Sequence, residues 1–175
     1  MHQTVVFCLL IFQVVTAEPP PPQCRGPPAG LQKNPKECCK FPKVFKEEDF
    51  KECGIEKPSE EDGSFHHRGP PDCDKQICLL QINNLMKDDT TIDKDAVTAF
   101  MQKWGDANGD FKDAVDVAID RCVKGDLPGP PELCEATKMI FCIGSTMFMN
   151  CPKWEDTDDC KKVKEHIEEC KPYFN

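Results

Sequence analysis

The sequence has few of the large apolar residues from which a domain of its length builds a core. Leu, Ile, Val and Phe account for 29 of the 158 residues from 18 to 175, or 18%. Basic residues are also scarce, since 22 Lys and Arg stand against 31 Asp and Glu, which gives a formal net charge of −9. Such a composition lies on the disordered side of the usual boundary. The folded state must therefore be stabilised by more than apolar burial.

The acidic balance excludes some classes of partner. The isoelectric point is about 4.9, and the sequence has no cluster of Lys and Arg. A surface of this sign repels phosphate backbones and anionic lipid headgroups. We therefore expect no nucleic-acid partner.

Motifs of common catalytic and cofactor sites are missing as well. The sequence has no GxxxxGK[ST], GxGxxG or GxSxG and no CxxC pair, so the usual phosphate loops, the hydrolase nucleophile and common thiolate zinc sites are not expected. Residues 106–110 resemble the start of a calcium loop, but Phe111 and Val117 stand where that loop needs Gly and Glu. The sequence predicts no enzyme, no metal and no cofactor, and it predicts solvent-facing positions for His66, His67 and His166.

The first residues have the pattern of a secretory signal peptide. Residues 1–17 contain no Lys, Arg, Asp or Glu, and their apolar run from Val5 to Val15 is too short to cross a bilayer. The run ends in small residues that suit cleavage before Glu18. No later stretch approaches 18 consecutive apolar residues, so we expect an exported product, residues 18–175, without membrane insertion.

Cysteine is abundant, and its count predicts disulfides. The chain has 13 Cys, and removal of Cys8 with the leader leaves an even set of 12. In an oxidising compartment such a set predicts up to six bridges. Cys38 and Cys39 are neighbours that would need a distorted eight-membered ring to join, so each is expected to reach a different distant partner.

Two further pairs of Cys are not expected to join internally. Cys73 and Cys78 are five residues apart, which places them about 140° apart around a helix. Cys142 and Cys151 are too distant along one helix. Each of these residues is therefore expected to link its helix to another part of the chain.

Apolar periodicity predicts an all-α fold with about six helices in a single domain, residues 18–175. Residues 18–72 are rich in Pro and Cys and predict loops, apart from a short helix, Val44–Cys53, that Gly54 ends. Residues 73–154 predict the helical core, and residues 155–175 a last helix and a tail. Predicted helices span about 72–87, a segment capped by Thr91 and running through Trp104, about 110–123, about 131–148, and a segment capped by Thr157.

The spacing of the Cys residues resembles that of insect odorant-binding proteins of the Plus-C subgroup. The resemblance rests on Cys78-x43-Cys122, on Cys142-x8-Cys151 followed directly by Pro152, and on the segment Phe148-Met149-Asn150-Cys151-Pro152-Lys153-Trp154. Extra Cys flank this shared core, upstream in Cys38-Cys39-Lys40-Phe41-Pro42 and downstream at Cys160 and Cys170.

The resemblance implies a compact helical bundle that carries small hydrophobic odorants or pheromones in an apolar cavity, without turnover, and it admits a homodimer. It also implies disulfides between Cys73 and Cys142, between Cys122 and Cys151, and between Cys78 and one of Cys38, Cys39 and Cys53. The remaining pairs, among Cys24, Cys134, Cys160 and Cys170, stay unassigned.

The residues themselves also favour a cavity. Cross-linked helices can keep a hollow that a self-packed bundle would fill, and soft Met with flat aromatic side chains suits its wall. Each residue taken singly fits a packed core better than a cavity wall, so the hypothesis concerns the set. The expected ligand-binding residues are Phe100, Met101, Trp104, Ile119, Met139, Ile143, Met147 and Phe148, and the tail residues Tyr173 and Phe174 either cover an opening or fray.

A second hypothesis stays open. A secreted disulfide-rich interaction protein, such as a protease inhibitor, would have the same cysteine content and no cavity. Its contact surface would be the Pro-rich N-terminal third of the chain.

Overall fold

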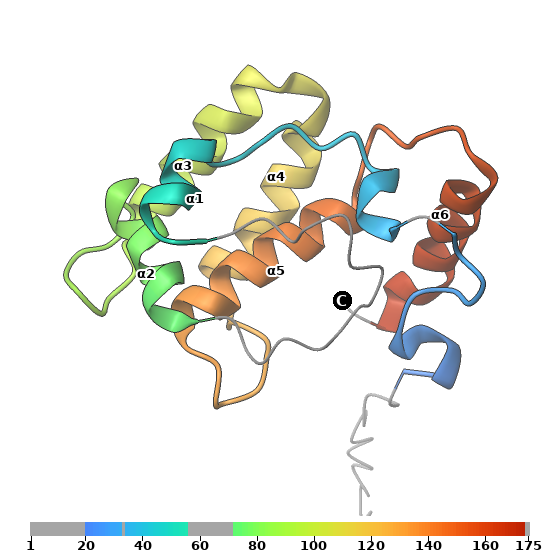
Figure 1. Cartoon of the computed structure of the whole chain (residues 1–175), viewed down its shortest axis with the longest axis horizontal. Helices are drawn as coiled ribbons and strands as arrows, with labels where there is room; N and C mark the ends of the chain where they lie inside the picture. Colours follow the sequence, from blue (N-terminus) through green and yellow to red (C-terminus); the bar gives the residue numbers. More distant parts are fainter. Residues whose placement is uncertain (1–19, 33, 56–71, 174–175) are drawn as a thin grey trace, which may run out of the picture.

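The structure, a computed structural model, describes residues 20–32, 34–55 and 72–173. These ranges contain six α-helices and no β-strand, which confirms the predicted all-α class (Figure 1). The predicted leader (residues 1–17), the two loop histidines (His66 and His67) and Phe174 lie outside the described residues. The helices are α1 (Glu47–Glu52), α2 (Cys73–Ile82), α3 (Lys94–Ala107), α4 (Lys112–Ala118), α5 (Glu135–Met149) and α6 (Asp158–Cys170).

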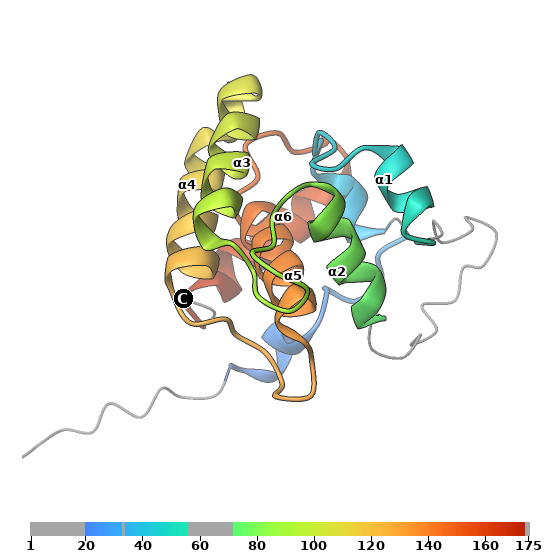
Figure 2. The ribbon, with the colours of Figure 1, turned by 90° about the vertical axis from the view of Figure 1, so that its left-hand side faces the viewer.

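Helix α5 is the central element of the bundle. It packs against α2 on one side and α4 on the other, and α3 lies against α4. Figure 2 shows α3 and α4 side by side at one edge and α2 with α1 at the opposite edge. Helix α6 lies to one side in Figure 1, next to the short 3₁₀ turn η2 (Pro35–Cys38).

Each of the first two helices is followed by a residue with a left-handed backbone conformation, Gly54 after α1 and Asn84 after α2. At the end of α1, Gly54 has φ +61°, its N–H donates to the Lys51 carbonyl, and the Ile55 N–H donates to the Phe50 carbonyl. This is the Schellman arrangement, in which a residue without Cβ avoids the usual steric penalty. The predicted stop at Gly54 is confirmed, although α1 begins at Glu47 and not at Val44.

Helix α2 is shorter than predicted. Asp72 caps it as expected, by accepting a hydrogen bond from the Asp74 N–H. It ends at Ile82 because Asn84 adopts φ +57°, and the Leu85 N–H then donates to the Leu80 carbonyl. The chain thus turns back five residues before the expected end, which buries the Leu85 side chain.

The next helix, α3, is capped by Asp93 and not by Thr91 as predicted. The Asp93 carboxylate accepts hydrogen bonds from the Asp95 and Ala96 amides, at 3.1 and 3.0 Å. Thr91 instead belongs to a tight loop, where its carbonyl accepts the Lys87 N–H at 2.8 Å. Both residue types favour the cap position, and the loop geometry decides between them.

The predicted helix at 110–123 is present, but it changes its hydrogen bonding along its length. Residues 112–118 form α4, and the chain continues without a break as a π-helix, η4 (Ile119–Lys124). Gly125 ends it as predicted. A Cβ at this position would lie 2.5 Å from the Arg121 carbonyl oxygen, so the wide final turn excludes any larger residue.

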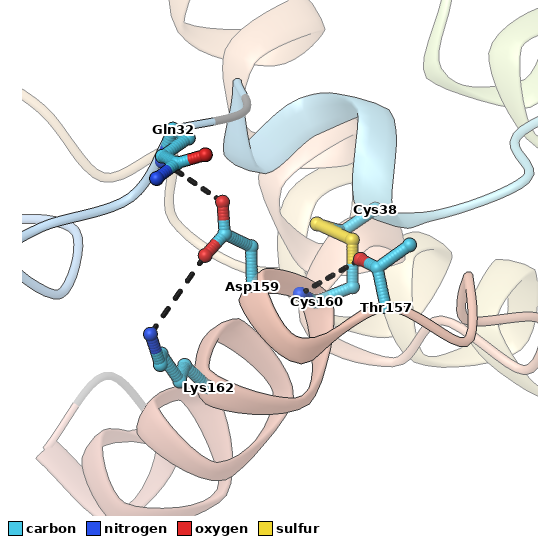
Figure 3. A network of polar contacts seen from close by, with 6 residues as sticks. All are labelled: Gln32, Cys38, Thr157, Asp159, Cys160 and Lys162. Atoms are coloured by element: carbon cyan, nitrogen blue, oxygen red, sulfur yellow. Dashed lines mark hydrogen bonds and ion pairs between the residues drawn. A yellow bond between two sulfur atoms is a disulfide. The ribbon is translucent and has the colours of Figure 1, made fainter.

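The last two helices follow their predicted patterns with small shifts. Helix α5 begins at Glu135, four residues after the predicted start, because residues 130–133 form a turn in which the Leu133 N–H donates to the Pro130 carbonyl. Helix α6 starts as predicted after Thr157, whose hydroxyl accepts the Cys160 N–H at 3.3 Å (Figure 3).

Six disulfides cross-link the described chain, as the even Cys count predicted. Two of the pairings implied by the resemblance, Cys73 with Cys142 and Cys122 with Cys151, are wrong. Cys122 lies in the π-helix beside α5 and joins Cys142 there, whereas Cys73 begins α2 next to the start of α5 at Cys134. The bonds are Cys24–Cys170, Cys38–Cys160, Cys39–Cys151, Cys53–Cys78, Cys73–Cys134 and Cys122–Cys142.

Of the four Cys left unassigned, Cys24 and Cys170 join each other, whereas Cys134 and Cys160 bond to Cys73 and Cys38 outside that set. The expectations from spacing agree with the bonds. Cys38 and Cys39 bond to different distant partners, and neither Cys73 with Cys78 nor Cys142 with Cys151 is joined. The partner of Cys78, left open among three residues, is Cys53.

Three of the bonds run in order between the two ends of the described chain. They join residues 24, 38 and 39 to residues 170, 160 and 151, so the two segments run antiparallel. Backbone hydrogen bonds from Glu155 N–H to the Cys38 carbonyl and from Lys40 N–H to the Lys153 carbonyl lie alongside, at 2.8 and 2.9 Å. We call this set of three bonds the disulfide ladder.

The ladder also fixes the start of α6. The Gln32 N–H donates to a carboxylate oxygen of Asp159 at 2.8 Å, and the other oxygen of Asp159 lies 3.8 Å from the Lys162 ammonium (Figure 3). Cys160, the next residue, bonds to Cys38. Polar and covalent contacts thus hold the first turn of α6 against the N-terminal segment.

Candidate ligand-binding pocket

An apolar pocket of about 170 Å³ lies where the segment before α1 crosses the bundle. Helices α2, α3 and α5 supply its other walls. We call residues 40–46, which form the crossing segment, the strap. All the residues around the pocket are apolar: Phe41, Val44, Phe45, Leu80, Leu85, Val97, Met101, Met139, Ile140, Ile143, Gly144 and Met147.

The pocket has a buried floor and one open side. Its floor consists of fully buried side chains from α2, α3, α5 and the turn after α2, whereas the strap residues and Ile140 and Ile143 are partly exposed. Gly144 is exposed, and nothing lies within 4 Å of the position that a Cβ would occupy. The mouth therefore lies between the strap and the middle of α5, at Gly144.

The volume sets the size of molecule that fits. A dry apolar cavity of ~150 Å³ admits benzene, and sites for drug-sized ligands usually measure ~300–1,000 Å³. The pocket is therefore suited to small volatile molecules when its side chains stay in place. Met101, Met139 and Met147 line much of the floor, and the flexible thioether side chain adapts to ligands of different shape.

The strap is fixed at both ends and in the middle. Cys39 bonds to Cys151 before the strap, and Cys53 bonds to Cys78 after α1. Between them, the indole Nε1 of Trp104 donates to the Lys43 carbonyl at 3.0 Å. This bond satisfies a backbone acceptor that the irregular strap cannot pair within itself.

Aromatic contacts support the strap from behind. The ring of Phe41 stacks on Trp104, with centroids 5.6 Å apart, and meets Phe111 edge-on at 5.3 Å. The ring of Phe45 stacks on Phe100 at 5.6 Å. Offset and edge-to-face pairs of this kind add ~0.5–1.5 kcal/mol each beyond their burial. The strap is therefore held against the bundle by packing as well as by disulfides.

Four of the eight expected ligand-binding residues line this pocket: Met101, Met139, Ile143 and Met147. Phe100 and Trp104 lie behind the strap and support its side chains. Ile119, the first residue of the π-helix, is buried in the core of the bundle. Phe148 lies outside the pocket and contacts Trp154, with ring centroids 5.5 Å apart. The binding role of every one of these residues stays a prediction.

The sequence does not predict the strap residues as part of the site, because the Pro-rich N-terminal third is predicted to form loops. An irregular segment has no periodicity from which a buried face can be deduced. A signal was nevertheless present, since Phe41, Val44 and Phe45 are apolar residues enclosed between Cys39 and Cys53. Gly144 was missed as well, although an isolated Gly inside a helical pattern costs ~1 kcal/mol and often has a packing or functional reason.

The three groups with a shifted pKa lie away from the pocket. Hydrogen bonds from the Thr90 and Thr91 amides hold the pKa of the Asp88 carboxyl below its ordinary value. At the start of α6, a hydrogen bond from Lys161 lowers the pKa of Asp156, and Asp156 in turn raises the pKa of Lys161. All three side chains are on the surface, so none of them supplies acid–base chemistry to the pocket.

His166 is less exposed than predicted. It is partly buried, and its ring Nε2 lies 2.9 Å from the Gly26 carbonyl oxygen. A carbonyl only accepts, so Nε2 is the protonated nitrogen in this contact.

Two other kinds of site are absent from the described residues. Residues 20–32, 34–55 and 72–173 contain no group of three or more His, Cys, Asp or Glu arranged to hold a metal ion. In the same part of the chain, none of the helices has the length and apolar character needed to cross a bilayer.

Comparison with known proteins gives a distant relationship. No family model matches the chain. Over 182 aligned residues, the chain is 24% identical to general odorant-binding protein 68 of Anopheles gambiae, and the alignment covers 93% of this chain and 82% of that protein. Similarity that extends along nearly the whole chain supports a distant relationship to an insect general odorant-binding protein.

Proposed function

We propose that the protein is a carrier that binds small apolar molecules, such as odorants or pheromones, reversibly and without turnover. The observation that carries this proposal is the pocket beneath the strap, whose lining contains no charged or hydrogen-bonding side chain. Such a site offers apolar burial, worth ~25 cal/mol per Å², and no nucleophile, acid or base. The distant relative is named as an odorant-binding protein, which agrees with this class of activity.

The same proposal includes export and the Plus-C subgroup. Twelve Cys joined in six bonds are typical of proteins made for oxidising surroundings. The leader at residues 1–17 supplies the route out of the cell. The extra Cys that flank the shared core all take part in the disulfide ladder and support the subgroup: Cys38, Cys39, Cys160 and Cys170.

Uptake of an apolar fluorescent probe tests the proposal. We expect the folded, oxidised protein to bind the naphthylamine probe 1-NPN with micromolar affinity, or ~8 kcal/mol, and small apolar volatiles to displace it. Absence of uptake by folded material would contradict the proposal.

Substitutions at the mouth test whether this pocket is the site. Gly144→Phe places a large ring at the mouth and should weaken probe binding about tenfold, or ~1.4 kcal/mol. Gly144→Ala is the matched control, because it removes the same glycine from the helix and adds only a methyl group in open space. Equal affinity of both variants and the unchanged protein would place the ligand elsewhere.

A change in the floor provides a second test. Val97→Ala removes two methyl groups from the pocket and should favour the longer of two homologous ligands. Val123→Ala is its control, since Val123 is equally buried but does not line the pocket. The same shift in ligand preference in both variants would count against the assignment.

The alternative of a protease inhibitor has a distinct outcome. An inhibitor presents a rigid exposed loop to its target, but Phe41 and Phe45 of the strap pack on Trp104 and Phe100 of α3. Inhibition of a secreted protease by the intact protein, together with no uptake of the probe, would favour the alternative.

A further inference from the structure

A second apolar groove runs along α6, at the C-terminal end of α5. It consists of two adjoining hollows of about 300 and 310 Å³ that share Met149, Ile167 and Lys171. We call them together the outer groove. No residue of the outer groove lines the pocket beneath the strap.

The floor of the outer groove is apolar along its length. The Cys24–Cys170 disulfide lies at one end and Val117 of α4 at the other, with Ile167 and Met149 between them. The Val117 side chain is 45% exposed.

The charges around the groove differ at its two ends. Near Cys24 and Cys170, the titratable residues of the lining are Arg25, His166 and Lys171, and no acid is among them. Toward Val117, the lining includes two acids, Asp113 and Glu168, with Lys164. In a chain of net charge −9, one end of the groove is thus locally basic.

The two permanent cations at the basic end have no acidic partner among the described residues. The Lys171 ammonium donates to the neutral amide oxygen of Asn150 at 2.6 Å, and the Arg25 Nε donates to the Pro20 carbonyl. By contrast, the lysines earlier in α6 lie beside carboxylates: Lys161 beside Asp156, Lys162 beside Asp159 and Lys164 beside Glu168.

His166 contributes to the shape of this end and not to its permanent charge. Its Nε2 hydrogen is directed to the Gly26 carbonyl, so the neutral ring has no second N–H for an anion. The recognition of a negative group therefore falls to Arg25 and Lys171.

We propose that the outer groove binds an aliphatic chain with a carboxylate headgroup, as a second site separate from the pocket beneath the strap. The headgroup lies between Arg25 and Lys171, and the chain passes over Ile167 and Met149 toward Val117. Asn150 offers Lys171 only a neutral acceptor, whereas a carboxylate accepts the same hydrogen bond and adds the attraction between opposite charges. At the far end Glu168 is paired with Lys164, and Asp113 is left to repel the headgroup, which favours this direction of the chain.

Methyl NMR with dodecanoate, below its micelle concentration, locates this ligand. In protein labelled at the Met and Ile methyl groups, we expect shifts at Met149 and Ile167 before any at Met139 and Ile143. The first pair lines the outer groove and the second pair lines the pocket. Shifts confined to Met139 and Ile143 would overturn the second site and leave the proposed carrier function intact.

Charge removal tests the headgroup contacts. The double variant Arg25→Gln, Lys171→Gln should bind dodecanoate about tenfold more weakly, with binding of the uncharged dodecanol unchanged. The matched control, Lys103→Gln with Lys162→Gln, removes two positive charges outside the groove and should leave both affinities unchanged. No difference between the double variant and its control, or equal losses for acid and alcohol, would overturn the proposal, as would no binding of dodecanoate.

Discussion

The bundle around the pocket and the C-terminal part of the molecule reach a folded state by different means. Helices α2 to α5 share a large apolar cluster in which Phe111, Val115 and Met139 are almost completely buried. The C-terminal unit, which we define as residues 20–32, 34–39 and 151–173, has a small cluster made of Cys38, Cys160 and Val163. It is held mainly by the disulfide ladder and lies to one side of the bundle (Figure 1).

The comparison shows where a composition poor in apolar residues is compensated. The bonds within the bundle join residues that are 20, 25 and 61 positions apart in the sequence. Those of the ladder join residues that are 112, 122 and 146 positions apart. A cross-link stabilises chiefly by restricting the unfolded chain, and more so for longer loops. The chain ends, which have little apolar surface to bury, therefore depend on cross-links that close long loops.

The sequence separations overstate what each bond of the ladder contributes by itself. Cys38 and Cys39 are adjacent, and their partners Cys160 and Cys151 are nine residues apart. Once one of these bonds is closed, the other closes only a short additional loop. The loss of a single bond should therefore be smaller than its separation suggests.

The largest expected effect is on the bundle. Phe111→Ala leaves a cavity in the core and removes the edge contacts with Phe41 and Trp104, and we expect it to lower the free energy of unfolding by ~3–5 kcal/mol. Val163→Ala in the C-terminal unit removes two methyl groups, ~0.8 kcal/mol each by burial, and should cost less. Urea unfolding of both variants measures the difference. Equal losses of unfolding free energy would contradict the proposal that the bundle depends more on apolar packing than the C-terminal unit does.

An intermediate effect is expected from two matched disulfide removals. Cys38→Ala with Cys160→Ala should cost ~2–3 kcal/mol, and Cys122→Ala with Cys142→Ala about 3 kcal/mol. All four Cys are buried, so the two variants do not differ in the exposure of the bond that is removed.

Native-state hydrogen exchange separates these two double variants more sharply than total stability does. Removal of the Cys38–Cys160 bond should accelerate amide exchange in α6 and leave exchange in α3 unchanged, because the bundle packs without that bond. Removal of the Cys122–Cys142 bond should accelerate exchange in α4 and α5. Exchange that rises uniformly in both variants would show a single cooperative unit and remove the distinction.

The smallest expected effect concerns two surface carboxyls, one in each part. Backbone N–H groups hold the pKa of Asp88 down in the bundle, and Lys161, 2.9 Å away, does so for Asp156 in the C-terminal unit. Both folded pKa values lie below the unfolded ones. The associated stability is therefore present above about pH 4 and lost as the pH falls through the folded values.

Salt should distinguish the two carboxyls. At 1 M the screening length is about 3 Å, so NMR titration should show the Asp156 pKa returning toward its ordinary value while that of Asp88 stays low. The reason is that an ion pair is screened, whereas a hydrogen bond within a turn is local. An equal salt response of both carboxyls would contradict these assigned causes.

The sequence predicted the helices better than their ends. Asp72, Thr157 and Gly54 act as caps because their side chains, or the lack of one, satisfy a local need that does not depend on the rest of the fold. The early end of α2 depends on the left-handed conformation of Asn84, and the choice of Asp93 over Thr91 depends on a loop. Such choices are made by tertiary structure and leave a weak trace in the sequence.

The candidate site was predictable only on its helical side. Periodicity identifies the buried face of α3 and α5, and therefore Met101, Met139, Ile143 and Met147. It cannot show whether a buried residue lines a hollow or fills the core, as Ile119 does. The opposite wall is the strap, whose position is set by two disulfides, and Cys pairing cannot be deduced from spacing alone.

The attachment of the strap at both ends has a consequence for a molecule that a protease has cut within the strap. A single cut by a protease between Cys39 and Cys53 would divide the polypeptide in two. The N-terminal fragment would still carry Cys24, Cys38 and Cys39, whose partners all lie beyond the cut. The nicked protein would therefore migrate as one species on a gel until a reductant is added, and both edges of the cut would stay tethered beside the pocket.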